Sequence, residues 1–208
     1  MQIQFDFHNF SVACILLFKT RYMTFQFRIQ LKNVAKPPVW RQIQVPEKLT
    51  FHDLHHLIQL IFGWEDCHLY QFSPKGYGSN PVIAIPSEDD WEQPEMNAMK
   101  TKLKKVFTSE KQTFNYLYDF GDDWGHQIVL EKILPDDIKS PVCLAGKGAC
   151  PPEDCGGAWG YENLKAILAN PKHEEHEVMK EWLGLDEDED WDANSFDIDE
   201  VNELLKDF

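Results

Sequence analysis

The side chains in this sequence that are best suited to chemistry gather first around one turn. Between Asp119 and His126 the chain carries three carboxylates and an imidazole, with Asp122 and Asp123 directly after Gly121. Carboxylate oxygens and imidazole nitrogens bind divalent cations and exchange protons near neutral pH. Turns are also rich in Asp because its side chain bonds nearby backbone amides. The pattern therefore predicts either a metal or acid–base site, or a turn whose Asp side chains serve only the backbone.

A second group consists of three thiols in a loop rich in glycine and proline. Cys143, Cys150 and Cys155 follow a C-x6-C-x4-C spacing. Thiolates are good zinc ligands, and His173 or His176 would supply a fourth. Structural zinc sites usually use pairs of cysteines two to four residues apart, which this loop lacks. Buried cysteines that pack a tight loop are the favoured interpretation, and metal binding is the alternative. In either case we expect the three sulfurs to lie close together without a complete zinc site.

The two loops together define the predicted binding site. Pro151 and Pro152 stiffen the chain before Glu153 and Asp154. If this loop meets the acidic turn, several carboxylates would share one cleft, which would attract a cation or a basic partner and repel phosphate. Aromatic side chains next to the turns would line the cleft. The predicted binding residues are Trp64, His68, Asp119, Asp122, Asp123, Trp124, His126, Glu153 and Asp154.

Three further histidines lie on a predicted helix. His52 and His56 are four residues apart, opposite the apolar stripe of that helix, so we expect both to be exposed to solvent. An i, i+4 histidine pair can bind zinc, but this pair lacks the glutamate of a His-Glu-x-x-His motif. His55 falls at the boundary of the core, where it either faces a pocket or completes a hydrogen-bond network.

Charge is distributed unevenly along the chain. The net charge is −15, and residues 174–208 alone hold fifteen acidic and two basic residues. The remaining 173 residues are therefore nearly neutral, which argues against a broad phosphate-binding surface. Four lysines do cluster between Lys100 and Lys105, and they could make local phosphate contacts; they are Lys100, Lys102, Lys104 and Lys105. A solvated run of charge is the favoured interpretation, so nucleic acid is a secondary candidate partner.

The order of the elements predicts an α+β fold: an antiparallel or mixed sheet with packed helices and a helical, acidic C-terminal segment. Thr50 and Asp53 indicate a capping box at the start of a helix that ends at Gly63. Hydrophobic periodicity and turn residues place the other elements. The expected strands are Thr24–Leu31, Val39–Val45, His68–Phe72, Val82–Ile85, Thr113–Phe120 and Trp124–Leu134, and the later helices are Tyr161–Ala169, Glu174–Leu183 and Ile198–Lys206.

Three segments are predicted: an N-terminal extension (1–22), an α+β core domain (23–184), and an acidic linker with a C-terminal helix (185–208). The apolar run Ser11–Phe18 is too short to span a bilayer and follows no basic residue, so neither a membrane anchor nor a signal peptide is expected. An odd number of cysteines, five, argues against a disulfide framework. A cytoplasmic protein is the expected outcome.

Three motifs carry a resemblance to a known family. They are Gly63-Trp64-x-x-x-His68-Leu69, the segment from Tyr118 to Trp124 (YDFGDDW), and the segment from Cys150 to Gly157 (CPPEDCGG). With the opening strand–strand–helix order, they resemble the Ri-plasmid open-reading-frame-three-like family, whose members are sometimes labelled passenger proteins of insertion elements. The resemblance implies an α+β roll-like fold and implies no activity.

Two classes of function fit these observations. No nucleophile elbow, P-loop or dinucleotide fingerprint is present, which favours a non-enzymatic module that binds a protein or a small ligand. The alternative is a metal-dependent, hydrolase-like enzyme centred on the turn from Asp119 to His126, with zinc or another divalent metal as cofactor. A nucleic-acid-associated accessory protein using the lysine cluster is a second alternative.

Overall fold

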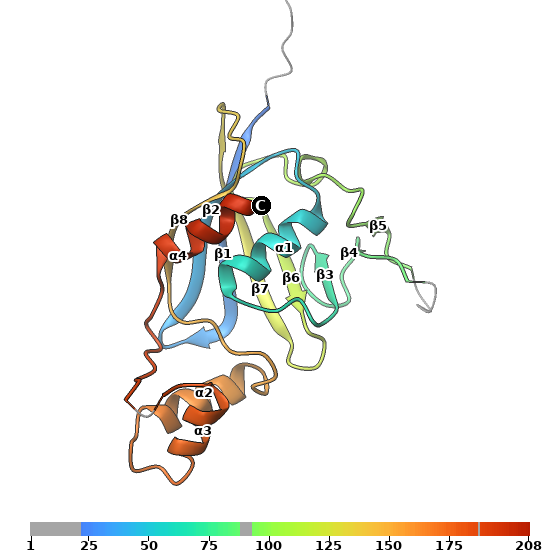
Figure 1. The fold of residues 1–208 in the computed structure, drawn as a ribbon. Coiled ribbons are helices and arrows are strands. Elements are labelled where there is room, and N and C mark those ends of the chain that lie inside the picture. Colours follow the sequence, from blue (N-terminus) through green and yellow to red (C-terminus); the bar gives the residue numbers. More distant parts are fainter. Residues whose placement is uncertain (1–21, 88–92, 187) are drawn as a thin grey trace, which may run out of the picture.

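The computed structural model describes residues 22–87, 93–186 and 188–208. Within them, eight strands form one open mixed sheet in the order β5-β4-β3-β6-β7-β1-β2-β8, accompanied by four α-helices and two short 3-10 helices (Figure 1). The predicted α+β class is confirmed. All neighbouring strands are antiparallel except β4 and β5. The predicted extension of residues 1–22 lies outside the described residues, apart from Tyr22.

The bounds of the elements follow the predicted pattern closely along the central strands. The strands are β1 Thr24–Ala35, β2 Pro38–Pro46, β3 Tyr70–Ser73, β4 Ile83–Ala84, β5 Met96–Asn97, β6 Thr113–Tyr118, β7 Trp124–Leu134 and β8 Val142–Lys147. The helices are α1 Phe51–Phe62, η1 Leu103–Lys105, α2 Gly157–Leu168, α3 His176–Trp182, α4 Ile198–Leu204 and η2 Leu205–Asp207. None of the helices described is long and apolar enough to cross a membrane.

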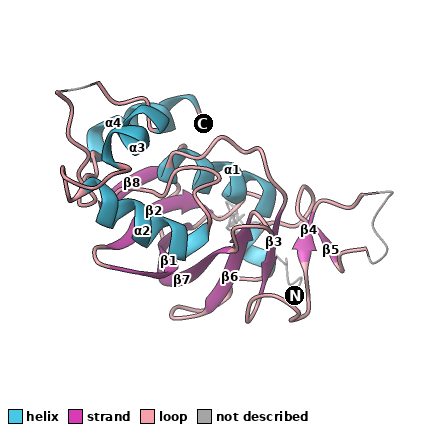
Figure 2. Ribbon diagram, turned by 90° about the horizontal axis from the view of Figure 1, so that it is seen from below, coloured by secondary structure: helices cyan, strands magenta, loops and turns pink. Residues whose placement is uncertain are grey.

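Helix α1 covers the middle of the sheet (Figures 1 and 2). Thr50 and Asp53 form the predicted capping box, and Gly63 ends the helix with a φ of 80°. Its predicted stripe is fully buried against the strands, which present Phe27 and Ile29 from β1. The stripe consists of Leu54, Leu57, Ile58 and Ile61. Burial of these side chains supplies the main stabilisation of this layer, at about 25 cal/mol per Å² of apolar area removed from water.

The strand order brings the two predicted loops toward one end of the sheet. Strands β6 and β7 form a hairpin, and β3 pairs with β6 so that Tyr70 lies opposite Tyr118. The backbone amide of Asp119 donates to the carbonyl of Leu69 at 3.0 Å. The hairpin turn therefore lies beside the segment that joins α1 to β3. That segment includes His68, which we expected inside a strand and which precedes β3 instead.

Helices α2 and α3 form a lobe beyond the end of the sheet, and the loop after β8 leads into it (Figure 1). The indole Nε1 of Trp64 donates to the carbonyl of Pro151 at 3.0 Å, which ties this loop to the end of α1. Helix α2 begins at Gly157, four residues earlier than predicted, because Gly156 adopts a left-handed conformation (φ 88°) that admits the chain into the helix.

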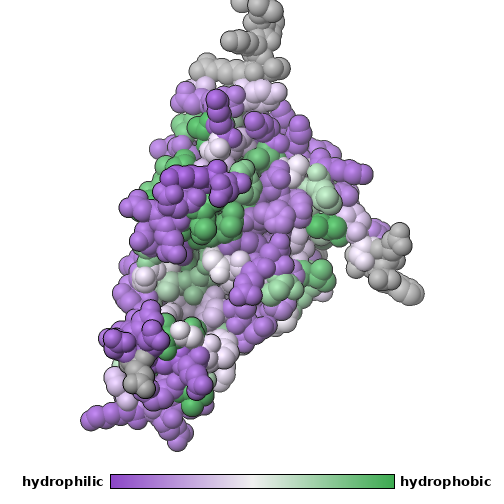
Figure 3. Space-filling view, in the orientation of Figure 1, coloured by the Kyte–Doolittle hydropathy of each residue, from purple (hydrophilic) through white to green (hydrophobic). Residues whose placement is uncertain are grey.

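The C-terminal segment packs onto the same body. Helix α4 lies along β8, where the side-chain amide of Asn202 accepts from the amide of Cys143 and donates to its carbonyl. Leu205 is 2% exposed within the core. Hydrophilic residues cover much of the face that carries α4 and the helical lobe, with apolar residues showing between them (Figure 3). Residues 198–208 are thus part of the packed structure, and the predicted boundary at residue 184 stays a prediction.

Candidate metal centre

The acidic turn and the Pro151–Gly157 loop meet directly. Oδ2 of Asp122 accepts from the backbone amide of Gly156 at 3.0 Å. At Gly157 the backbones approach so closely that a Cβ atom would lie 2.5 Å from the carbonyl oxygen of Asp122, and the φ of 66° favours glycine as well. These contacts bring carboxylates from both loops to one place.

His68 lies at the centre of this junction. Its Nε2 atom is 3.3 Å from Oδ1 of Asp154, 3.8 Å from Oδ2 of Asp119 and 3.9 Å from Oε2 of Glu153. The three carboxylates come from the hairpin turn and from the loop before α2, and the histidine comes from the connection between α1 and β3. One imidazole nitrogen therefore faces three separate carboxylates.

Two of the carboxylates are held in place through one oxygen each. Oδ1 of Asp119 accepts from the amide of Gly121 at 2.8 Å. Oε1 of Glu153 accepts from the hydroxyl of Tyr118 at 2.9 Å and from the amide of Glu65 at 3.0 Å. The oxygens that remain, Oδ2 and Oε2, are the ones nearest His68. Hydrogen bonds from the backbone and from Tyr118 thus fix Oδ2 of Asp119 and Oε2 of Glu153 in their positions near His68.

Two polar atoms at the junction are buried and unsatisfied. Nε2 of His68 and Oε2 of Glu153 have no hydrogen-bond partner among the described residues. Leaving a buried polar atom unpaired costs roughly 1–3 kcal/mol, more when the group is charged. Asp154 is 75% exposed at its side chain, whereas Glu153 and Asp119 are 15% and 10% exposed. The junction is thus enclosed on the side of Glu153 and open to solvent at Asp154.

Two participants escaped the sequence analysis. The thiol of Cys67 lies with His68 and Glu153 in a group whose ligand atoms are all within 4.8 Å of one another. The hydroxyl of Tyr118 accepts from the Cys67 amide at 3.1 Å while donating to Glu153. Burial and the hydrogen bond to Glu153 raise the pKa of Tyr118, which outweighs the opposite effect of the bond from the Cys67 amide, so its hydroxyl stays protonated and remains a donor. Tyr118 belongs to the predicted strand Thr113–Phe120, but the strand pattern does not indicate these partners.

Some of the predicted binding residues lie elsewhere. His126 is completely buried, packs edge-to-face on Phe62 and Trp64, and burial lowers its pKa to about 3. It is therefore neither an exposed strand residue nor one of the groups facing His68. Trp124 is 1% exposed and belongs to the core. Asp123 is exposed and lines a different groove, together with Leu69 and Phe120.

The three cysteines of the second loop do not share a ligand position. Among the described residues, no group of clustered metal-ligating atoms contains Cys143, Cys150 or Cys155. Burial raises the pKa of all three thiols, that of Cys155 to about 12, which disfavours the thiolate that zinc requires. The geometry here favours the interpretation in which buried cysteines pack the loop. A metal-binding role for them stays a prediction.

The lysine cluster is solvent-exposed, as its charge predicts. Lys100, Lys102, Lys104 and Lys105 all lie at the surface around η1. Lys104 pairs with Glu47 at 3.5 Å. Exposed ion pairs of this kind contribute little, about 0–1 kcal/mol. Phosphate contact by these lysines stays a prediction.

The protein is an α+β protein whose open mixed sheet is crossed by helix α1. Its central hairpin ends at a junction of one histidine and three carboxylates. A family model for plasmid pRiA4b ORF-3-like proteins matches residues 23–200, and the chain belongs to that family. The family resemblance of the three sequence motifs is therefore confirmed.

Two relatives extend this finding. The chain is 34% identical to the uncharacterized protein y4hQ of Sinorhizobium fredii over 184 residues, which cover 88% of this chain and 90% of that protein. It is also similar to the crystal structure of MM3350 from Methanosarcina mazei Go1, described as a protein of unknown function. That likeness has a TM-score of 0.74 and 38% identity, covering 86% of this chain and 98% of the other.

Proposed function

We propose that this protein is a binding module whose ligand at the loop junction is a divalent metal ion. The ligand atoms are Nε2 of His68, Oδ2 of Asp119, Oε2 of Glu153 and Oδ1 of Asp154. The observation that carries the proposal is the pair of buried, unpartnered atoms, Nε2 of His68 and Oε2 of Glu153, which face each other at 3.9 Å. A metal ion placed between them would satisfy both.

The spacing of the ligand atoms supports a metal. Zinc bonds to nitrogen and carboxylate oxygen are about 2.0–2.2 Å long, so tetrahedral ligand atoms stand roughly 3.3–3.6 Å apart. The separations of 3.3, 3.8 and 3.9 Å from His68 are close to that range. The ligand atoms form two overlapping groups, His68 with Asp119 and Asp154, and His68 with Glu153 and Cys67, so binding by all four ligands requires Glu153 and the two aspartates to move toward one another. Three carboxylates carry more negative charge than a divalent ion neutralises, which makes the junction unsuitable for phosphate.

The chemical types of the ligand atoms limit which metals are expected to bind. Imidazole suits zinc and other transition metals, whereas carboxylates also accept manganese and magnesium. The thiol of Cys67, within reach of His68 and Glu153, shifts the preference toward zinc because thiolates are soft ligands. We therefore expect zinc to bind more tightly than manganese, and magnesium to bind weakly.

A metal-dependent hydrolase is the second candidate. Its support is the exposure of Asp154, which leaves one side of the junction open to water and to a substrate. Zinc sites that catalyse hydrolysis keep such an open position for a water molecule. The binding module ranks first because it requires only the ligand atoms at the junction, whereas a hydrolase also requires a general base and groups that stabilise an oxyanion.

The first experiment measures metal binding by the full chain, purified without a histidine tag. Mass spectrometry of the metal content and calorimetric titration with Zn²⁺ should show an ion that His68→Ala and Glu153→Gln each release or weaken by at least about tenfold. Asp123→Asn is the matched control, because Asp123 belongs to the same turn but faces another groove. Equal zinc affinity in all four proteins would reject the proposed site.

The second experiment separates a binding module from an enzyme. Zinc-loaded protein and His68→Ala are compared on aryl ester and aryl phosphodiester substrates. A binding module predicts the same background rate for both proteins. Turnover that depends on zinc and on His68 would instead establish the hydrolase.

The family description supports a wider biological context. It refers to a plasmid reading frame, which is consistent with the predicted mobile-element passenger protein of the cytoplasm. Fractionation of cells producing the full chain would test the location. Comparison of the genes that flank family members would test the mobile-element association.

A further inference from the structure

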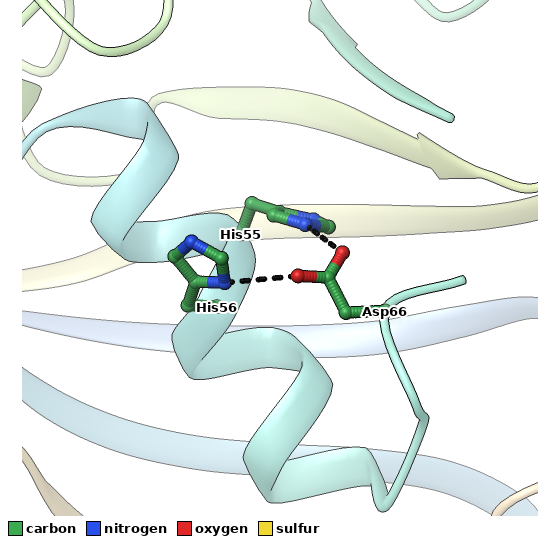
Figure 4. Close-up of side chains that lie close together, drawn as sticks. All are labelled: His55, His56 and Asp66. Carbon is green, nitrogen blue, oxygen red and sulfur yellow. Dashed lines mark hydrogen bonds and ion pairs between the residues drawn. The ribbon is translucent and has the colours of Figure 1, made fainter. Parts of the chain in front are cut away.

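We propose a second metal site beside α1, where His55, His56 and Asp66 converge (Figure 4). It would take a divalent transition metal of the zinc class, such as Zn²⁺, Co²⁺ or Ni²⁺. This site goes beyond the proposed function because it shares no ligand with the loop junction.

The site is built from the helix and the loop that follows it. His55 and His56 project from α1 toward Asp66, which comes three residues after the helix-ending Gly63 (Figure 4). Nε2 of His55 is 2.6 Å from Oδ1 of Asp66, and Nδ1 of His56 is 3.1 Å from Oδ2. One atom from each of the three side chains lies within 4.8 Å of the other two. Each oxygen of the Asp66 carboxylate therefore faces a different imidazole, Oδ1 facing His55 and Oδ2 facing His56.

His55 is 1% exposed. Its Nε2 atom lies 2.6 Å from the Asp66 carboxylate and its Nδ1 atom lies 2.8 Å from the hydroxyl of Tyr116, so Nε2–H donates to Asp66, and a metal on Nε2 requires the ring proton to move to Nδ1. The ring of Tyr70 stacks on His55 with a centroid separation of 3.6 Å and fixes its orientation. The side chains of His56 and Asp66 are 42% and 37% exposed, which gives an ion access from solvent.

The types of ligand atom at this site determine which metals are expected to bind. Two imidazoles and one carboxylate form the three-ligand set of many open zinc sites, in which water takes the fourth position. Calcium and magnesium prefer sites made only of oxygen ligands. To admit an ion, the carboxylate of Asp66 has to move away from His55 by less than about 1 Å, since ligand atoms on zinc stand roughly 3.3 Å apart. The loop position of Asp66 makes such a shift inexpensive.

A third histidine, His52, is hydrogen-bonded to the proposed ligand His56, so metal binding at His56 affects the ring of His52. Nε2 of His52 is 3.0 Å from Nε2 of His56, and Nδ1 of His52 is 2.9 Å from the hydroxyl of Tyr70. His52 and His56 are both partly exposed, and they also bond to each other. Without metal, Nδ1–H of His56 donates to Asp66, so its Nε2 accepts the proton of His52. Nδ1 of His52 then accepts from the hydroxyl of Tyr70.

A metal on Nδ1 of His56 reverses this arrangement. A His56 ring that binds the metal through Nδ1 carries its proton on Nε2 and donates it toward His52. His52 has to accept through Nε2, and its own proton moves to Nδ1, where it donates to the hydroxyl oxygen of Tyr70. No proton is gained or lost by the two rings. Metal binding therefore changes the tautomer of His52, which does not touch the metal.

The test uses the full chain carrying His68→Ala, labelled with ¹⁵N-histidine and titrated with Zn²⁺ alone. Long-range ¹H–¹⁵N correlation spectra report which ring nitrogen carries a proton or a metal. We expect one zinc ion to bind, with shifts at Nε2 of His55 and Nδ1 of His56 and a change of tautomer at His52. Spectra in which saturating zinc leaves all three rings unchanged would overturn the proposal.

Substitutions make the test independent of the spectra. Asp66→Asn in the same background should weaken zinc affinity at least about tenfold, and His56→Gln should do the same at a more exposed position. Asp123→Asn should leave the affinity of this site unchanged. Unaltered zinc affinity in both Asp66→Asn and His56→Gln would also reject the site.

The two metal sites can fail separately. If only the junction site is wrong, His68→Ala binds as much zinc as the wild type, and the three helix histidines still respond. If only the helix site is wrong, His68→Ala removes all zinc binding. Circular dichroism of each variant before titration establishes that it is folded.

Discussion

Asp66 and His68 stand two residues apart in one loop, yet they face different clusters of side chains. Asp66 bonds to His55 and His56 on α1, whereas His68 faces the carboxylates of the hairpin turn and the loop before α2. Between them, the amide of Cys67 donates to the hydroxyl of Tyr118. The loop from Trp64 to Leu69 thus contributes side chains to both clusters, so a displacement of this loop would alter the distances within both.

Tyr118→Phe should weaken metal binding at the loop junction without unfolding the protein. The hydroxyl is a support for Glu153 and for the Cys67 amide, and it is not itself a proposed ligand. Loss of such supporting hydrogen bonds typically lowers metal affinity about 10–100-fold. Calorimetric titration with Zn²⁺ measures the effect. Tyr22→Phe, at a tyrosine far from the junction in sequence and 41% exposed, serves as control.

Gly157→Ala should separate the two loops. The new Cβ atom would lie 2.5 Å from the carbonyl of Asp122, in addition to the strain of a φ of 66°. Gly184→Ala is a matched control, because its φ is 69° and no atom lies within 4 Å of the added Cβ. We expect the first variant to lose more unfolding free energy than the second, and to bind zinc more weakly. Equal urea unfolding curves would show that the close approach is readily relieved.

Burial of His126 should make stability depend on pH. Its folded pKa of about 3 is below the unfolded value of about 6.5, so the unfolded chain takes up a proton that the folded ring refuses. The stability is complete above about pH 6.5 and falls as the pH drops toward 3, by about 1.4 kcal/mol per pH unit. Urea unfolding at pH 7 and pH 5 should show a loss about 2 kcal/mol smaller in His126→Phe than in the wild type. An equal loss in both proteins would assign the titration to other groups.

Arg41→Lys should destabilise the fold. The buried guanidinium donates to the carbonyls of Trp40, Ile61, Lys147 and Gly148, and it lies against the ring of Phe196. Lysine has too few donors, in the wrong geometry, to replace this set. We expect a loss of about 2–4 kcal/mol in the free energy of unfolding, measured with urea. Arg28→Lys, whose guanidinium stacks over the ring of Trp40, should cost less than about 1 kcal/mol.

Local signals in the sequence predicted much of the fold. The capping box of Thr50 and Asp53, the glycine that ends α1 and the alternation of β1, β2, β6 and β7 all depend on neighbouring residues, and they fold as expected. The Gly156-Gly157 pair was interpreted as loop, because glycine is a poor helix former and only tertiary contact shows that α2 begins there. Strand β5 pairs through two residues inside a segment rich in Pro and acid, a contact without local periodicity.

The candidate site was predictable only in part. The acidic turn, the Pro151–Gly157 loop and His68 could be selected by residue type, and the structure brings them together. His126 follows the turn in sequence but faces the opposite way, into the core, because strand alternation places it beside Tyr116. The participation of Cys67 and Tyr118 depends on the pairing of β3 with β6, which no local pattern reveals. Long-range strand order, rather than composition, decides these contacts.

The paired hydrogen bonds between Asn202 and Cys143 have a consequence for association between molecules. β8 is the last strand of the sheet, and the outward amide and carbonyl of Cys143 are groups to which a strand of another chain could add. The side-chain amide of Asn202 occupies both, in the way that a peptide group of an incoming strand would. Asn202 thus blocks the pairing of another strand at this edge of the sheet. A variant that lacks its side-chain amide is expected to fold but to self-associate.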